Sequence, residues 1–259
     1  MVMKNISKLL IATALLCLPQ LAWTQVAADS RFASPFVAYR IIGDEPKPLL
    51  VVEGKQDKRP LKVWTIGDSN GAIAHGWTTQ LQNMLPNGTL LNNSESGRTI
   101  GFDNLGRTSL NALRNIDTYI AQAEAEIGDK PFDFVILCLG TNDTKADFKD
   151  RQDEIPGNYG QILDKLLASK VFESGKTKLI LVSPPPMRAK NMEEKYWGSS
   201  ERIKHLIPVL KKEAKKRHLT YVNIYRPLEA TFTRYAQDGV HMNATGQMFV
   251  AQKILRKMK

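Results

Sequence analysis

A serine and an Asp-x-x-His pair stand near opposite ends of this sequence of 259 residues. Ser69 follows an apolar run that ends in Gly-Asp-Ser, and Asp238 precedes His241 by three residues. A serine hydroxyl is a poor nucleophile until a base takes its proton, and a histidine oriented by a carboxylate is the usual base. One loop that carries Asp238 and His241 could therefore activate Ser69 for attack on a carbonyl carbon.

Two segments between these residues complete a pattern. Segment 92–99 reads Asn-Asn-Ser-Glu-Ser-Gly-Arg-Thr, and segment 134–143 is an apolar run that opens into Gly-Thr-Asn-Asp. The chain thus offers, in order, Ser69, Gly97, Asn142 and His241. From about residue 62 to its C-terminus the sequence resembles the GDSL or SGNH hydrolase family, which is named for these residue types in separate blocks. Gly-Asp-Ser or Asp-x-x-His alone is weak evidence, whereas four blocks in this order are a specific signal.

The resemblance implies a role for each residue. Ser69 is the nucleophile, His241 the general base and Asp238 its orienting partner. The oxyanion donors are the backbone N–H groups of Ser69 and Gly97 and the side-chain amide of Asn142.

The neighbours of these residues are given structural roles. Asp68 is expected to shape the turn before Ser69, and Asp143 to brace the loop that holds Asn142. Where the family name has leucine, this chain has Asn70. We interpret Asn70 as a neutral departure, because the position after the nucleophile carries no required chemistry.

Each residue also has a structural alternative when it is taken alone. Ser69 could cap a helix, Gly97 could be an ordinary turn glycine, and Asn142 could cap a strand end. Asp238-Gly239 is a common turn dipeptide, which is compatible with a role in orienting His241. Of the remaining histidines, His75 is expected on the next helix at a cleft rim, and the others on the surface: His205 and His218.

Candidate substrate contacts surround this set. Arg98 follows Gly97 directly, and Tyr196 and Trp197 lie in the long segment 184–198. Aromatic side chains in such a loop can stack on sugar or aryl rings. They can equally anchor the loop by packing, and the sequence supports both interpretations.

Alternating strand and helix signals predict the elements that position these residues. Short apolar runs alternate with amphipathic segments, which favours an α/β fold with a parallel sheet covered on both faces. The family resemblance implies a three-layer α/β/α sandwich around a roughly five-stranded, flavodoxin-like sheet. We predict strands at 61–66, 89–91, 132–139, 178–182 and 221–224, and helices at 75–85, 115–127, 155–167, 199–216 and 244–256, with Ser199 as an N-cap.

The N-terminal sixty residues are predicted to lie outside this domain. Lys4 and Lys8 precede a short apolar run, which is typical of a secretory signal peptide in residues 1–28, cleaved near residue 24 or 28. A lipid anchor at Cys17 is disfavoured because Leu16 stands where a small residue is expected. Residues 29–60 are predicted to form an N-terminal extension with a hairpin from 36–42 and 49–52, and residues 61–259 the hydrolase domain. The protein is therefore expected to be secreted or periplasmic, with no stable membrane anchor.

Composition excludes several other classes of function. The formal net charge is +10, but the densest basic run, 211–217, is expected to be the solvated face of a helix. No nucleic-acid motif accompanies it. The scattered histidines give no metal-ligand spacing, and no phosphate loop is present, so we expect neither metal nor cofactor. Cys138, alone after signal cleavage, is interpreted as a small buried hydrophobe.

These observations predict a secreted serine esterase that hydrolyses O-acyl esters through an acyl-enzyme. Family analogy suggests O-acetyl esters on carbohydrate, so an acetylated glycan is the expected partner. One alternative is a lipase or lysophospholipase that acts on lipid esters. The other is a non-catalytic glycan-binding protein on the same fold, against which the intact set of site residues argues.

Overall fold

The computed structural model describes residues 38–42, 45–50, 60–85, 87–128 and 130–258, and the chain divides into units 1–55 and 56–259. In the first unit, β1 (Ala38–Ile42) pairs antiparallel with β2 (Glu45–Leu50). The expected hairpin is present, but its second strand begins four residues earlier, since the free edges of a two-stranded ribbon tolerate proline. The predicted signal peptide lies outside the described residues.

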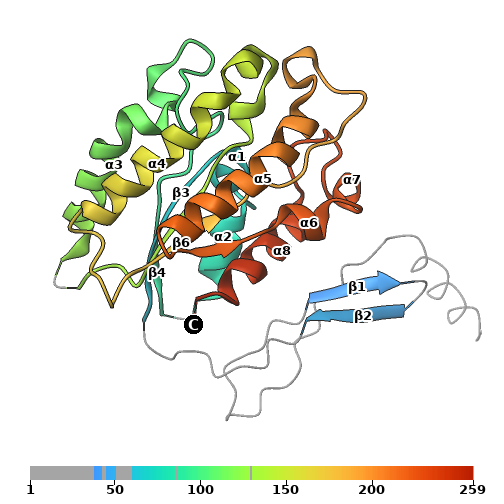
Figure 1. Ribbon diagram of the computed structural model, residues 1–259. Coiled ribbons are helices and arrows are strands. Elements are labelled where there is room, and N and C mark those ends of the chain that lie inside the picture. The colour runs from blue at the N-terminus through green and yellow to red at the C-terminus, as the bar shows by residue number, and fades with distance from the viewer. Residues whose placement is uncertain (1–37, 43–44, 51–59, 86, 129, 259) are drawn as a thin grey trace, which may run out of the picture. The chain divides into compact units, whose positions relative to one another are not determined.

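A parallel five-stranded sheet forms the centre of the second unit (Figure 1). Its spatial order is β4-β3-β5-β6-β7, and every neighbouring pair is parallel. Counted along the chain within this sheet, the order is 2-1-3-4-5, as in flavodoxin-like folds. The predicted fold class is confirmed. The strands are β3 (Lys62–Gly67), β4 (Thr89–Asn92), β5 (Phe134–Cys138), β6 (Lys178–Val182) and β7 (Thr220–Val222).

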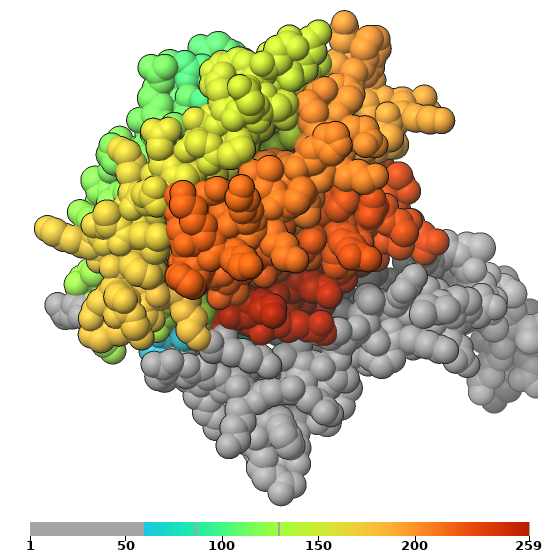
Figure 2. Space-filling view, in the orientation of Figure 1, coloured from blue at the N-terminus to red at the C-terminus, as the bar shows by residue number. Residues whose placement is uncertain are grey.

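Alternating side chains of the central strands feed two separate cores. In β5, Val135 and Leu137 join the core under α3 (Ala112–Ile127), α4 (Ile155–Ala168) and α5 (Ser199–Lys216). These three helices cover one face of the sheet (Figures 1 and 2). Phe134 and Ile136 of the same strand join the other core, with α2 (Trp77–Asn83) and α8 (Ala244–Leu255). The sheet is therefore the middle of three layers.

Helix boundaries differ from the prediction where a local hydrogen bond sets them. Helix α3 begins three residues early because the Asn111 side chain accepts the Arg114 N–H at 3.1 Å. The N-cap of α5 is Gly198, not Ser199, whose hydroxyl donates to the Thr144 carbonyl at 2.7 Å instead. Three short helices were not predicted: α1 (Ser69–Ala72), α6 (Tyr225–Leu228) and α7 (Phe232–Tyr235).

Other features of the sequence have ordinary structural places. The lysines of run 211–217 are exposed on α5, as expected of a solvated face, and Cys138 is buried with a free thiol. Among the described residues, no helix combines the length and the apolar character needed to cross a membrane.

Candidate active site

The predicted nucleophile lies at the carboxyl end of β3, beside β5. Ser69 is the first residue of α1, and Asp68 caps this short helix by accepting the Asn70 N–H at 3.0 Å. The turn-shaping role expected of Asp68 agrees with this contact. Burial raises the pKa of Asp68, against the opposing effect of its hydrogen bonds. In this strand order, the chain connections that follow β3 and β5 run to opposite faces of the sheet. Sheets of this kind bind ligands in the crevice at the carboxyl ends of two such strands.

The loop after α7 delivers the histidine to this serine. The Asp238 carboxylate accepts the N–H groups of Val240 and His241, both at 2.8 Å. Its second oxygen lies 2.6 Å from His241 Nδ1, and His241 Nε2 lies 2.9 Å from Ser69 Oγ. Gly239 has φ +83°, a conformation that favours glycine, so the sequence Asp-Gly suits this tight loop. The structure thus joins the three residues predicted for catalysis in one hydrogen-bonded chain.

The charge of Asp238 suits this arrangement. Partial burial opposes ionisation, but the Val240 and His241 N–H groups and the His241 ring together lower the pKa of Asp238. An ionised Asp238 holds the proton on His241 Nδ1 and leaves Nε2 free to accept one. It would also stabilise the imidazolium that forms when His241 takes the Ser69 proton.

Besides Ser69, the predicted oxyanion donors Gly97 and Asn142 follow β4 and β5, two strands that both pair with β3. Gly97 has φ +86°, and its carbonyl accepts the Asn104 side-chain amide at 2.6 Å. The Asn142 amide donates to the Arg98 carbonyl at 3.1 Å, which engages one of its two hydrogens. Among the described residues, the N–H groups of Ser69 and Gly97 have no acceptor. These unpaired donors are the kind that a developing oxyanion requires.

Asp143 braces these loops, as the sequence suggested. Its buried carboxylate accepts the Ile100 N–H at 2.8 and 3.0 Å and the Gly101 N–H at 3.4 Å. Burial raises the pKa of Asp143 to about 7. The contact fixes the segment that follows Gly97 to the segment that holds Asn142.

The three candidate substrate contacts have different surroundings. Arg98 is 4% exposed, lies 4.5 Å from the Tyr119 ring centroid and pairs with Glu95 at 2.9 Å. Tyr196 packs against a small cluster that includes Val240, next to His241, which favours the packing interpretation. Trp197 is 62% exposed.

Asn70 is not the neutral departure that the sequence suggested, because its side chain makes three hydrogen bonds. Its buried side chain donates to the Val240 carbonyl at 3.3 Å and accepts the Met242 N–H at 3.2 Å and Gln247 Nε2 at 2.7 Å. It therefore holds the residues on both sides of His241 to the turn that carries Ser69. The available signal was a polar amide directly after the nucleophile, at the end of an apolar run.

A second missed residue, Arg188, supports the histidine loop from the segment after β6. Its N–H donates to the Gly239 carbonyl at 3.0 Å, and its guanidinium donates to the Gln237 carbonyl at 2.9 Å.

His75 lies in the turn between α1 and α2, not on the predicted helix, and its Nε2 is 3.3 Å from the Met242 carbonyl. His205 lies exposed on α5, and His218 follows that helix with φ +55°. The described residues contain no group of His, Cys, Asp or Glu side chains suited to hold a metal.

Comparison with known proteins relates this site to a family. Solved structures similar to this chain include a carbohydrate acetylesterase from Sinorhizobium meliloti, with 22% identity and a TM-score of 0.60 over 76% of this chain and 97% of that one. An aryl esterase from M. smegmatis has 20% identity and a TM-score of 0.63 over 76% and 97% of the two chains. A lipase/acylhydrolase from Enterococcus faecalis has 17% identity and a TM-score of 0.59 over 76% and 95%.

The similar structures show the fold of the chain, whereas a match to a family model indicates its activity. No curated protein matches the sequence significantly. The model of the GDSL-like lipase/acylhydrolase family matches residues 63–248, a span that includes every predicted catalytic residue. The chain therefore belongs to the GDSL-like lipase/acylhydrolase family and is a carboxylic ester hydrolase.

Proposed function

We propose that the protein is a secreted serine esterase that removes O-acetyl groups from carbohydrate through an acyl-enzyme. The observation that carries the catalytic part is the continuous chain from Asp238 to His241 to Ser69, with contacts of 2.6 and 2.9 Å. These distances lie within hydrogen-bond reach, as a nucleophile and its general base require.

In the first half-reaction, Ser69 Oγ attacks the ester carbonyl while its proton moves to His241 Nε2. The carbonyl π electrons become an oxyanion, which accepts hydrogen bonds from the Ser69 and Gly97 N–H groups and the Asn142 amide. Collapse of this intermediate breaks the bond to the alcohol oxygen, which takes the proton from His241. Water then attacks the acyl-enzyme with His241 as base, and the acid leaves as Ser69 regains its proton.

The proposed substrate rests on separate support. One structurally similar protein is a carbohydrate acetylesterase, and this class of substrate suits a protein with a secretory signal peptide. The signal peptide itself is a prediction from residues 1–28. A lipid ester is the main competitor, because a lipase/acylhydrolase is also among the similar structures.

Two measurements test the proposal. Hydrolysis of p-nitrophenyl esters of increasing acyl length should be fastest for acetate, and acetate should be released from acetylated xylan or pectin. Ser69→Ala should abolish both activities with an unchanged circular dichroism spectrum, since loss of a triad serine costs several orders of magnitude in rate. A preference for long acyl chains would move the assignment to lipids. Activity of Ser69→Ala above about a tenth of wild type would remove Ser69 as nucleophile.

A further inference from the structure

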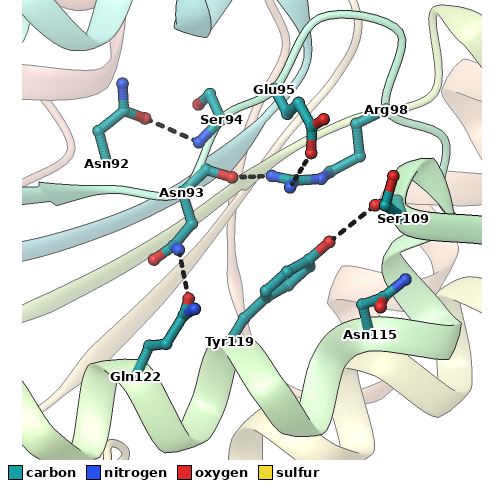
Figure 3. Close-up of a pocket in the computed structure, with 9 residues that line it drawn as sticks. All are labelled: Asn92, Asn93, Ser94, Glu95, Arg98, Ser109, Asn115, Tyr119 and Gln122. Atoms are coloured by element: carbon teal, nitrogen blue, oxygen red, sulfur yellow. Dashed lines mark hydrogen bonds and ion pairs between the residues drawn. The ribbon is translucent and has the colours of Figure 1, made fainter.

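A pocket of about 400 Å³ lies between the end of β4, the loop that follows it and helix α3 (Figure 3). The nine described residues that line it all carry polar side chains. Pockets for small molecules usually have mostly apolar walls with a few polar groups, and this one differs in kind. We call it the polar pocket; its amide side chains are Asn92, Asn93, Asn115 and Gln122.

Contacts among the lining residues hold the walls of the polar pocket in place. The Arg98 guanidinium lies over the Tyr119 ring and pairs with Glu95, and the Tyr119 hydroxyl donates to the Ser109 carbonyl at 3.3 Å (Figure 3). A ligand would therefore have few side chains to order when it binds, which lowers the entropic cost of binding.

The polar pocket is continuous in the chain with the candidate active site. Arg98 follows Gly97, and its carbonyl accepts the Asn142 amide at 3.1 Å. At the other end of the same loop, the Glu95 N–H donates to the Gly67 carbonyl at 3.1 Å, two residues before Ser69. One loop thus lines the polar pocket and carries a proposed oxyanion donor.

We propose that the polar pocket is a subsite for the polyhydroxylated part of the ester, a carbohydrate. Amides and hydroxyls supply both donors and acceptors, which match sugar hydroxyl groups, whereas an acyl chain would gain no apolar surface there. The inference rests on the proposed function and adds the residues that recognise the sugar.

Gln122 offers the sharpest test. It is exposed on α3 and accepts the Asn93 amide at 3.0 Å, and within the described part of the chain its own NH₂ group has no acceptor. Gln122→Leu removes this donor at nearly constant size. Gln161→Leu is the matched control, because Gln161 is exposed on α4 and does not line the polar pocket.

The measurement is the ratio of kcat/KM for acetylated oligosaccharides from xylan and pectin to kcat/KM for p-nitrophenyl acetate. Loss of one hydrogen bond to the sugar should lower this ratio roughly three- to tenfold in Gln122→Leu, while Gln161→Leu keeps the wild-type ratio. An unchanged ratio in a variant that still hydrolyses both substrates would overturn the subsite and leave the proposed function standing. If the wild-type protein hydrolyses p-nitrophenyl acetate but none of the oligosaccharides, both the carbohydrate substrate and the subsite are overturned.

Discussion

At the scale of single residues, the candidate site depends on side chains that hold other side chains. Asp238 contacts His241, and Asn70 contacts the backbone on both sides of it. Geometry of this kind contributes to rate because the reacting groups are already oriented when the substrate arrives. Substitution of a supporting residue should therefore change kcat more than KM.

Asp238→Asn is expected to lower kcat by about 10³–10⁴, because an amide no longer enforces the His241 tautomer that accepts a proton at Nε2. Steady-state kinetics with p-nitrophenyl acetate measures the loss. Asp153→Asn, an exposed carboxylate on the segment before α4, is the control and should keep wild-type kcat. A loss below tenfold in Asp238→Asn would show that another group orients His241.

Asn142→Ala is expected to lower kcat by roughly 10²–10³ with KM little changed, because its amide should bind the oxyanion more strongly than the ground-state carbonyl. Asn142→Asp should be at least as damaging, since it places a carboxylate beside the developing negative charge. If Asn142 serves only to hold the Arg98 carbonyl, both variants will lose melting temperature and keep near-normal kcat. Kinetics and thermal unfolding of the two variants distinguish these roles.

Asn70 is expected to act as a positioning residue. Asn70→Leu removes its contacts to Val240, Met242 and Gln247 and should lower kcat at least about tenfold, with a smaller effect on KM. Asn70→Asp keeps the acceptor for the Met242 N–H and should restore part of the lost kcat.

Stability alone must be separated from positioning in this experiment. Val222→Ala on β7 removes two buried methyl groups from the core that contains Phe134 and Ile136. This variant should destabilise the fold while kcat stays near wild type below the melting temperature. If Asn70→Leu and Val222→Ala have the same kcat, Asn70 contributes to packing and does not position His241.

At the scale of elements, the carboxyl edge of the sheet is held together by contacts between loops. Asp143 joins the loop after β5 to the loop after β4, and Arg188 joins the segment after β6 to the histidine loop. Each loop carries part of the candidate site, so these ties set the distances between residues that are far apart in sequence.

Asp143 should make stability depend on pH. Its pKa is about 7 in the folded protein and about 4 in an unfolded chain, so the stability it contributes is complete below pH ~4 and is lost as pH rises through about 7. An amide at this position cannot titrate, so Asp143→Asn should lose less melting temperature than wild type between pH 5 and pH 8. Thermal unfolding across this range measures the difference, with Asp153→Asn as control. The same pH dependence in all three proteins would contradict the role given to Asp143.

At the scale of the whole molecule, the described residues of the second unit form a hydrophobic core on each face of the sheet. Among the residues that the structure describes, the members of the two large hydrophobic clusters all lie at position 61 or later. The candidate site draws only on residues of this same unit, from Ser69 to His241. Such a unit has what independent folding requires.

We therefore expect a chain of residues 56–259 to fold and to hydrolyse p-nitrophenyl acetate with the kcat of the longer protein. Circular dichroism, cooperative thermal unfolding and steady-state kinetics test this expectation. The full chain without residues 1–28 is the comparison. A truncated protein that does not unfold cooperatively would show that residues before position 56 belong to the catalytic unit.

The sequence determined the fold class and the identity of the residues that meet in the candidate site. Strand and helix periodicity is local, and buried parallel strands such as 134–138 are continuous apolar runs, so the order of elements could be predicted. Ser69, Gly97, Asn142 and His241 could be identified from the four blocks that resemble the family, because the chemistry of the site restricts the residue types at these positions.

Only the tertiary structure decided how these residues are held. The role of Asn70 depends on contacts with Val240 and Met242, about 170 positions away, and no local pattern encodes such a pairing. The polar pocket likewise exists because the loop after β4 meets α3, and the segment 184–198 supports the histidine loop because Arg188 reaches its carbonyls. A local sequence pattern specifies which groups are available, whereas packing of distant segments determines which of them touch.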